Sequence, residues 1–180
     1  TNWRNNKEKS NEDGIASLAG VCIARVSTVP FFVVTQLKNQ IRALGAQGSK
    51  VTIVCSDGPD MANLKGLNGV NRLVIDIPRP ISPLRDVLAL IRLFMFFKRQ
   101  NIQIAHSTTP KAGLLTALAA LVAGVPIRLH TFTGQRWVHM VGLRKWLARS
   151  SDKLIGMLNT RCYADSESQR NFLIEQGLVA

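Results

Sequence analysis

Short apolar runs alternate along the chain with longer segments in which apolar residues recur every three or four positions. The apolar runs predict strands at about residues 21–26, 51–55, 73–77, 102–105, 126–130 and 161–164. The segments between them predict helices at about residues 35–47, 83–98, 110–123, 141–159 and 167–176. Strands that alternate with helices of this length form βαβ units. We therefore expect an α/β, Rossmann-like fold with a doubly wound, mainly parallel sheet and helices on both faces.

Proline, glycine and hydroxyl residues mark the ends of these helices. Pro83 and Pro110 occupy the first helical position after Ser82 and Thr109, and Thr109 is expected to cap its helix. Gly124 is expected to end that same helix. The helix at 83–98 is expected to turn one apolar row toward the sheet, made of Leu84, Leu88, Ile91 and Phe94 or Met95.

Length and composition indicate one domain. The chain has 180 residues, of which 46% are hydrophobic, which suffices for one well-cored domain and is too little for two ordinary ones. The polar stretch at the start lacks the apolar core of a secretion signal, so we expect a disordered leader over 1–19 and one domain over 20–180. Cys22, Cys55 and Cys162 are far apart in apolar contexts, as in the reduced thiols of a cytoplasmic protein.

The charge of the chain predicts attraction to anions. Its 23 Lys and Arg residues against 11 Asp and Glu give a formal charge of +12. Nucleic acid is the weakest candidate partner, because the cations are spread over several elements without a nucleic-acid-binding signature. Residues 92–99 and 143–149 mix cations with large apolar groups, which would suit an anionic membrane surface. Alternatively, the aromatic groups are core and the cations only solvate the outer faces of the helices.

Ligands of an open α/β sheet bind beside the carboxyl ends of the strands, so the loops at that edge hold the candidate site. The first loop, expected at 27–34, contains no glycine, and the GxGxxG signature of a dinucleotide-binding enzyme is therefore missing. No DxD pair, zinc-binding spacing or GxSxG nucleophile motif appears along the chain. We expect neither a metal nor a cofactor.

A first polar cluster, HSTTPKAG, follows the predicted strand at 102–105. It contains His106, Ser107, Thr108 and Lys111 and opens a helix, whose free N–H groups and positive dipole end favour an anion. These four residues are candidate contacts to a phosphate or to sugar hydroxyls. The alternative is purely structural, with caps, turn residues and a solvated lysine.

A second polar cluster, HTFTGQRW, follows the predicted strand at 126–130. Histidine titrates near neutral pH and is the commonest general acid or base, which makes His130 the candidate catalytic residue. A structural role for His130 is the alternative. The loop beyond it supplies further candidate substrate contacts: Thr131, Thr133, Gln135 and Arg136.

These motifs resemble the amino-terminal half of glycosyltransferase family 4 enzymes, and most closely those that build bacterial surface polysaccharides on a polyprenyl-diphosphate carrier. The resemblance covers about residues 20–178. It rests on the segments STVPFFVVTQLKNQIRALGAQGSKVTIVCSDG, IPRPISPLRD, IAHSTTPKAGLLTALAALVAGVPIRLHTFTGQRW and YADSESQRNFLIEQG. Its most specific parts are HSTTPKAG and HTFTGQ.

The resemblance implies a GT-B fold, in which two Rossmann-like domains face each other across a cleft and the first mainly binds the acceptor. The implied reaction moves a sugar from a nucleotide sugar to a polyprenyl-diphosphate-linked saccharide, with retained configuration and without a metal. The implied location is the cytoplasm, peripheral on the inner face of the bacterial inner membrane. By resemblance, His130 reaches the transferred sugar, Ser27 and Thr28 lie by the donor diphosphate and the acceptor hydroxyl, and 106–111 line the acceptor side.

The chain ends at residue 180, where enzymes of this family continue into a donor-binding domain. We therefore expect an acceptor-side domain that has no transferase activity by itself. Two alternatives remain open. One is half of a sugar-nucleotide epimerase of related architecture, and the other is a basic, non-catalytic module that binds anions or membranes.

Overall fold

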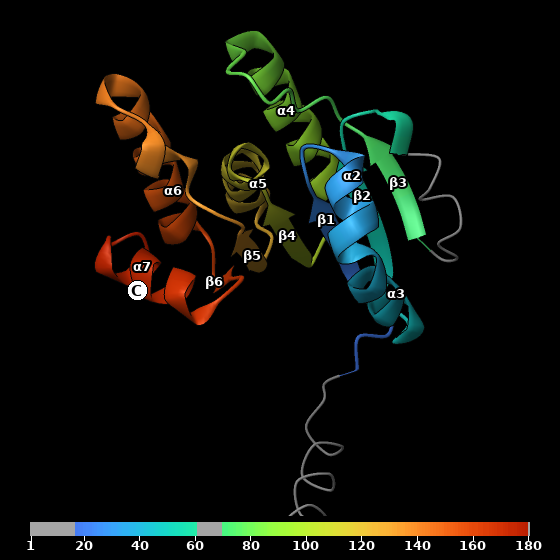
Figure 1. The fold of residues 1–180 in the computed structure, drawn as a ribbon. Coiled ribbons are helices and arrows are strands. Elements are labelled where there is room, and N and C mark those ends of the chain that lie inside the picture. The colour runs from blue at the N-terminus through green and yellow to red at the C-terminus, as the bar shows by residue number, and fades with distance from the viewer. Residues whose placement is uncertain (1–16, 61–69, 180) are drawn as a thin grey trace, which may run out of the picture.

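Six parallel strands form one sheet in the computed structural model, which describes residues 17–60 and 70–179 (Figure 1). The spatial order is β3-β2-β1-β4-β5-β6, and every neighbouring pair is parallel. The α/β fold expected from the sequence is therefore confirmed. The strands are β1 (Cys22–Val26), β2 (Lys50–Cys55), β3 (Val70–Val74), β4 (Ile104–Thr108), β5 (Ile127–Phe132) and β6 (Arg161–Ala164).

Helices follow the strands and cover both faces of the sheet (Figure 1). Three consecutive helical segments follow β1, and a short 3₁₀-helix lies between β5 and the long helix after it. The helical elements are α2 (Pro30–Phe32), η1 (a π-helix, Val33–Leu37), α3 (Lys38–Ala46), α4 (Pro83–Arg99), α5 (Pro110–Ala123), η3 (a 3₁₀-helix, Arg136–His139), α6 (Gly142–Leu158) and α7 (Glu167–Glu175).

Alternate strand residues build a separate hydrophobic core on each face of the sheet. On one face, Ala24 and Ala105 pack with α4 and α5. On the other face, Ile23 and Ile53 pack with η1 and α3, where Ile41 is fully buried. A third cluster joins α6 and α7 to the end of β5. Each polar residue of the central strands therefore belongs to one of two layers.

The strand order reverses between β1 and β4, which lie side by side at the centre of the sheet. At such a topological switch point the connections leave in opposite directions and open a crevice for a ligand. The loop after β1 starts at Ser27, and the turn after β4 contains Thr109. Both candidate loops therefore meet at the switch point.

Several element boundaries differ from the expected ones. The helix after β1 already begins at Pro30, whose fixed φ suits the first helical position, so the loop expected at 27–34 is shorter. β3 ends at Val74 instead of residue 77. β4 and β5 continue to Thr108 and Phe132, so His106 and Thr131 lie within strands and not in loops. Both strands are paired on each side, and these backbone ladders continue through the polar residues.

The prediction for the buried face of α4 was wrong. Ala89, Leu93 and Phe97 pack against the sheet, whereas the row expected to be inside is turned outward. Of that row, Leu84 is 82% exposed and Leu88 is 53% exposed, and only Phe94 packs against the core. The helix is apolar on two sides, so the 3.6-residue period alone did not identify the side that faces the sheet.

The residues that flank α5 and α7 mark the ends of these helices, although Thr109 does so without its side chain. Ser166 caps α7 by accepting a hydrogen bond from the Gln169 backbone N–H, at 3.2 Å. Gly124 ends α5 in the left-handed region, with φ of 76°. Thr109 precedes α5 but makes no side-chain cap hydrogen bond, and its own φ is 72°. The predicted capping role of the Thr109 hydroxyl was therefore wrong.

Residues 1–16, which make up most of the expected leader, lie outside the described residues. Of the three cysteines, Cys55 is buried, and Cys22 and Cys162 are half-buried. Within 17–60 and 70–179, no helix combines the length and the apolar character needed to span a bilayer.

Candidate functional site

β4 and β5 bring the two polar clusters together at the carboxyl edge of the sheet. Ser107 lies opposite His130, and Thr108 lies opposite Thr131. Side chains alternate between the faces of a strand, so Ser107 and His130 belong to the α5 layer, while His106 and Thr131 belong to the opposite layer. The two histidines therefore take part in separate hydrogen-bonded pairs, one on each face.

His130 is enclosed beneath the first turns of α5. Its Nδ1 lies 2.9 Å from Ser107 Oγ, and its ring meets Phe132 edge to face with the centroids 4.6 Å apart. Gly113 makes room for the imidazole, because a Cβ atom there would lie 2.5 Å from His130 Cε1. The side chain is buried, and burial lowers the pKa of His130 to about 3. The ring is therefore neutral near pH 7.

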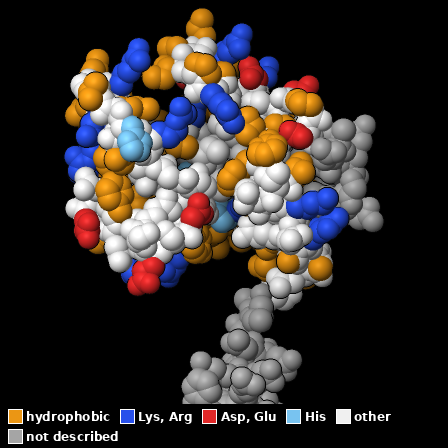
Figure 2. Space-filling view, in the orientation of Figure 1, with side chains coloured by type: hydrophobic (Ala, Val, Ile, Leu, Met, Phe, Trp, Pro, Cys, Tyr) orange, Lys and Arg blue, Asp and Glu red, His pale blue; other side chains and the backbone are white. Residues whose placement is uncertain are grey.

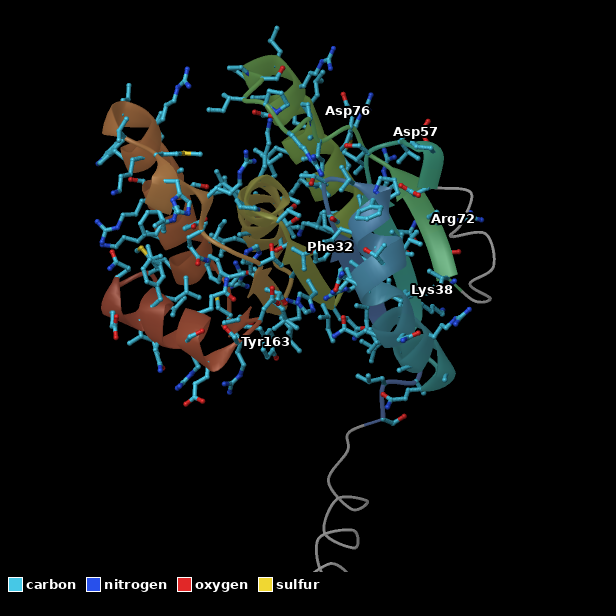
Figure 3. The ribbon with its side chains drawn as sticks, viewed as in Figure 1. Phe32, Lys38, Asp57, Arg72, Asp76 and Tyr163 are labelled. Carbon is cyan, nitrogen blue, oxygen red and sulfur yellow. The ribbon has the colours of Figure 1, made fainter. Side chains whose placement is uncertain are left out.

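His106 occupies the other face and is 8% exposed. Its Nε2 lies 2.8 Å from Thr131 Oγ1, and the ring of Tyr163 from β6 lies 5.9 Å away between centroids (Tyr163 is labelled in Figure 3). Burial lowers the pKa of His106 to about 2, and the positive charge of Arg25 contributes to this shift. A neutral His106 can hydrogen-bond a ligand, but it does not supply a positive charge.

Lys111 already has partners. Its Nζ lies 2.6 Å from Asp86 Oδ1 and also donates to the Pro80 carbonyl oxygen. The other carboxylate oxygen of Asp86 accepts from the Ser82 backbone N–H at 3.1 Å. The first turn of α5 is thus tied to the first turn of α4. The charge of Lys111 is balanced by Asp86, which reduces its attraction for a bound anion.

Ser27 and Thr28 begin the loop after β1 and are both buried. The Ser27 backbone N–H donates to the Val54 carbonyl of β2 at 2.9 Å, so pairing with β2 continues past the last residue of β1. The Ser27 hydroxyl lies 3.5 Å from the Val29 carbonyl. This loop is held against the sheet at the switch point.

Residues beyond β5 line an open groove of about 500 Å³. Its lining includes Thr133, Gly134 and Gln135 after β5 and residues around the amino terminus of α7. Arg136 is exposed in η3, and the buried Nε2 atom of Gln135 has no hydrogen-bond partner. The complete lining is Thr133, Gly134, Gln135, Val138, His139, Asp165, Ser166, Ser168, Gln169 and Phe172.

Several residues that shape this edge were not predicted from the sequence. Asp86 neutralises Lys111, Gly113 accommodates His130, and Arg25 is buried beside His106. Asp152 of α6 accepts a hydrogen bond from Trp137 Nε1 at 2.7 Å, which ties α6 to η3, the helix that contributes Val138 and His139 to the groove. The sequence signals were weak, although a lone arginine inside the apolar run CIARV was visible. The described residues contain no group of three or more His, Cys, Asp or Glu side chains that could hold a metal ion.

Curated relatives of this chain are glycosyltransferases. The chain is 30% identical over 143 residues to the capsular polysaccharide biosynthesis glycosyltransferase CapM of Staphylococcus aureus, covering 79% of this chain and 37% of the relative. It is 39% identical over 56 residues to the UDP-Gal:alpha-D-GlcNAc-diphosphoundecaprenol alpha-1,3-galactosyltransferase of Escherichia coli, covering 31% of this chain and 14% of the relative. The chain therefore spans less than half the length of either relative.

Solved structures confirm the fold as one half of larger enzymes. A glycosyltransferase from Rickettsia africae superimposes with a TM-score of 0.68 at 15% identity, covering 89% of this chain and 41% of the other. A putative UDP-N-acetylglucosamine 2-epimerase from Listeria monocytogenes reaches 0.66 at 14% identity, covering 88% and 43%. Transferase and epimerase halves thus share this fold, which by itself does not separate the two activities. The family model of the glycosyl transferase 4-like domain, in contrast, matches residues 33–180, and the chain belongs to this family.

Proposed function

We propose that this chain is the acceptor-binding domain of a retaining, metal-independent glycosyltransferase. The full enzyme would move a sugar from a nucleotide sugar to a polyprenyl-diphosphate-linked saccharide during synthesis of a bacterial surface polysaccharide. The observation that carries the proposal is the family match over residues 33–180. The names of the two curated relatives support it, since one acts in capsule synthesis and the other on a diphosphoundecaprenol-linked sugar.

The proposed acceptor wall is the carboxyl edge at the switch point. His106, Ser107 and Thr108 end β4, and the loop that starts with Ser27 and Thr28 lies on the neighbouring strand. Parallel sheets of this type bind ligands at this position. Because the charge of Lys111 is balanced by Asp86, we assign Lys111 mainly to holding the first turn of α5 in place.

His130 is the proposed catalytic residue. Ser107 engages its Nδ1, which leaves Nε2 as the nitrogen for the transferred sugar. The low pKa of His130 keeps the ring neutral, which suits a hydrogen bond to a sugar hydroxyl better than storage of a positive charge. The hydroxyl, amide and guanidinium groups of Thr131, Thr133, Gln135 and Arg136 are proposed as further substrate contacts, because they belong to the end of β5 and the segment after it.

Exposed apolar and cationic side chains on the outward faces of α4 and α6 support the proposal that the enzyme contacts a membrane. These helices lie on either side of α5 (Figure 1), and Figure 2 shows hydrophobic and cationic side chains at the upper end of the molecule in the same orientation. Leu84 is 82% exposed, and Trp146 is 64% exposed. Exposed cations alternate with these apolar groups, as in helices that rest on anionic headgroups. The exposed apolar residues on the two helices are Leu84, Val87, Leu88, Ile91, Leu143, Trp146 and Leu147, with Ile81 and Val141 just before them, and the cations are Arg85, Arg92, Arg144 and Lys145.

The full-length enzyme tests this proposal. It should be incubated with a panel of nucleotide sugars and polyprenyl-diphosphate-linked saccharides in the presence of EDTA, and the anomeric configuration of the product determined by NMR. We expect transfer with retention that survives EDTA. Formation of an epimerised nucleotide sugar without any acceptor product would instead assign the chain to an epimerase.

A further inference from the structure

Arg25 is a cation buried in the central strand of the sheet. Its side chain is 1% exposed, and its Nε and Nη1 atoms have no hydrogen-bond partner. Burial lowers the pKa of Arg25 to about 10, so the guanidinium remains charged near pH 7. A buried charge without a partner strongly destabilises a fold. We therefore expect a negatively charged group beside the Arg25 guanidinium.

Within 17–60 and 70–179, the strands of the sheet and the three helical segments after β1 contain no acidic residue. None of the six strands contains Asp or Glu, and neither does the segment 30–46 that forms α2, η1 and α3. Asp57 and Asp76, labelled in Figure 3, follow β2 and β3. Asp57 accepts from the Gly58 backbone N–H, and Asp76 lies 3.7 Å from Arg85. Since no salt bridge within the described residues involves Arg25, its counter-charge must come from elsewhere.

Two hydroxyl groups at the end of β4, the strand next to Arg25, also lack partners. Arg25 pairs in register with His106, so Thr108 lies two residues further along the adjacent strand, on the same face. Thr108 is 1% exposed, and neither its Oγ1 atom nor the buried Oγ1 atom of Thr109 has a hydrogen-bond partner. Thr109 also has a φ of 72°, which is a strained value for a residue other than glycine. Residues with such strained backbone angles are common at ligand sites.

We propose that Arg25, Thr108 and Thr109 form an oxyanion site at the β1/β4 switch point, and that a phosphate group of a phosphorylated ligand fills it. A phosphate can accept from the guanidinium, from both hydroxyls and from the free N–H groups that begin the 14-residue helix α5. Val29 and Thr109 are partly exposed, so the anion enters from the carboxyl edge. The inference deepens the proposed function, in which both substrates carry phosphate.

Pyrophosphate binding to the 180-residue chain tests this site. Wild type should show a higher Tm in pyrophosphate than in chloride of equal ionic strength, and Arg25→Met should lose this increase. By calorimetry, the Kd for pyrophosphate should rise about tenfold or more in Arg25→Met and in Thr108→Val, because each loses a donor to a charged acceptor. In chloride alone, Arg25→Met should be at least as stable as wild type, because the unpaired buried charge is gone.

Two other arginines serve as controls. Arg42→Met removes an exposed charge from α3 and should leave the Kd unchanged. Arg128→Met removes a structural arginine, which donates to the Leu158 carbonyl at 2.8 Å and to the Val125 carbonyl at 2.7 Å, and should lower the Tm in every buffer.

Three results would overturn the proposal. The first is a wild-type Tm that pyrophosphate does not raise. The second is a loss of stability in Arg25→Met, in chloride, as large as that in Arg128→Met, which would make Arg25 structural. The third is equal stabilisation by acetate, which would point to a carboxylate from the remainder of the enzyme. None of these results changes what the transfer assay of the full-length enzyme would show. The anion-site proposal and the proposed function can therefore fail independently of each other.

Discussion

Replacing Gly113 with alanine perturbs the enclosure of His130 directly. The new Cβ atom would lie 2.5 Å from His130 Cε1, 2.8 Å from its Nδ1 and 3.0 Å from Ile155 Cδ1. The imidazole has little room to move, because its Nδ1 lies 2.9 Å from Ser107 Oγ and the ring of Phe132 packs edge to face against it. The substitution therefore forces either the helix or the histidine to move.

Two effects oppose each other in this variant. Alanine stabilises a helix interior by about 1 kcal/mol relative to glycine. Overpacking a filled core costs about 1–3 kcal/mol, and losing the bond between Ser107 and His130 costs about 1 kcal/mol more. We expect the steric effect to prevail and to lower the free energy of unfolding by about 1–3 kcal/mol, or about 2–4 °C of Tm for each kcal/mol.

Thermal and urea unfolding of the 180-residue chain measure this change, and Gly45→Ala is the matched control. Gly45 lies in α3 with nothing within 4 Å of an added Cβ atom, so its replacement should be neutral or stabilise by up to about 1 kcal/mol. Truncating the ring in Gly113→Ala/His130→Ala should relieve the clash, so the double variant should be less destabilised than the sum of the two single variants. If Gly113→Ala proved as stable as Gly45→Ala, the close enclosure of His130 would be refuted.

Three further predictions concern other parts of the molecule. Burial raises the pKa of Asp152 to about 6 from 3.8, so stability from this group is present at low pH and is lost as the pH rises through 6. Asp152→Asn should flatten the pH dependence of urea unfolding by about 3 kcal/mol between pH 3 and pH 7, of which about 1 kcal/mol falls between pH 5 and pH 7. Leu84→Ser and Trp146→Ser should each weaken sedimentation with anionic vesicles about tenfold, whereas Val122→Ser, at an exposed apolar residue near the end of α5, should not. In the full-length enzyme, His130→Ala should lower kcat at least about a hundredfold while the Tm falls only modestly; unchanged kcat would make His130 structural.

The order of strands and helices could be predicted because each local signal agreed with the tertiary structure. Pro83, Pro110 and Ser166 mark helix starts, and the glycine at 124 ends α5. The buried side of α4 could not be predicted in this way. Its two apolar faces give the same periodic signal, and the packing of Ala89 against the sheet decides between them.

The composition of the candidate edge was visible in the sequence, but its pairing was not. HSTTPKAG and HTFTGQ were recognised as neighbours at one edge of a sheet. The register of β4 against β5 then separates His106 from His130 onto opposite faces. Likewise, the link between Lys111 and Asp86 depends on how two helices pack, because the residues are far apart along the chain.

Binding of the acceptor by the 180-residue chain tests the central claim most directly. A polyprenyl-diphosphate-linked saccharide in neutral vesicles should bind the chain, with empty vesicles as the control, and adding a nucleotide sugar should leave that Kd unchanged and yield no product. A chain that binds nucleotide sugars but shows no preference for acceptor-loaded over empty vesicles would contradict its role as the acceptor-binding domain.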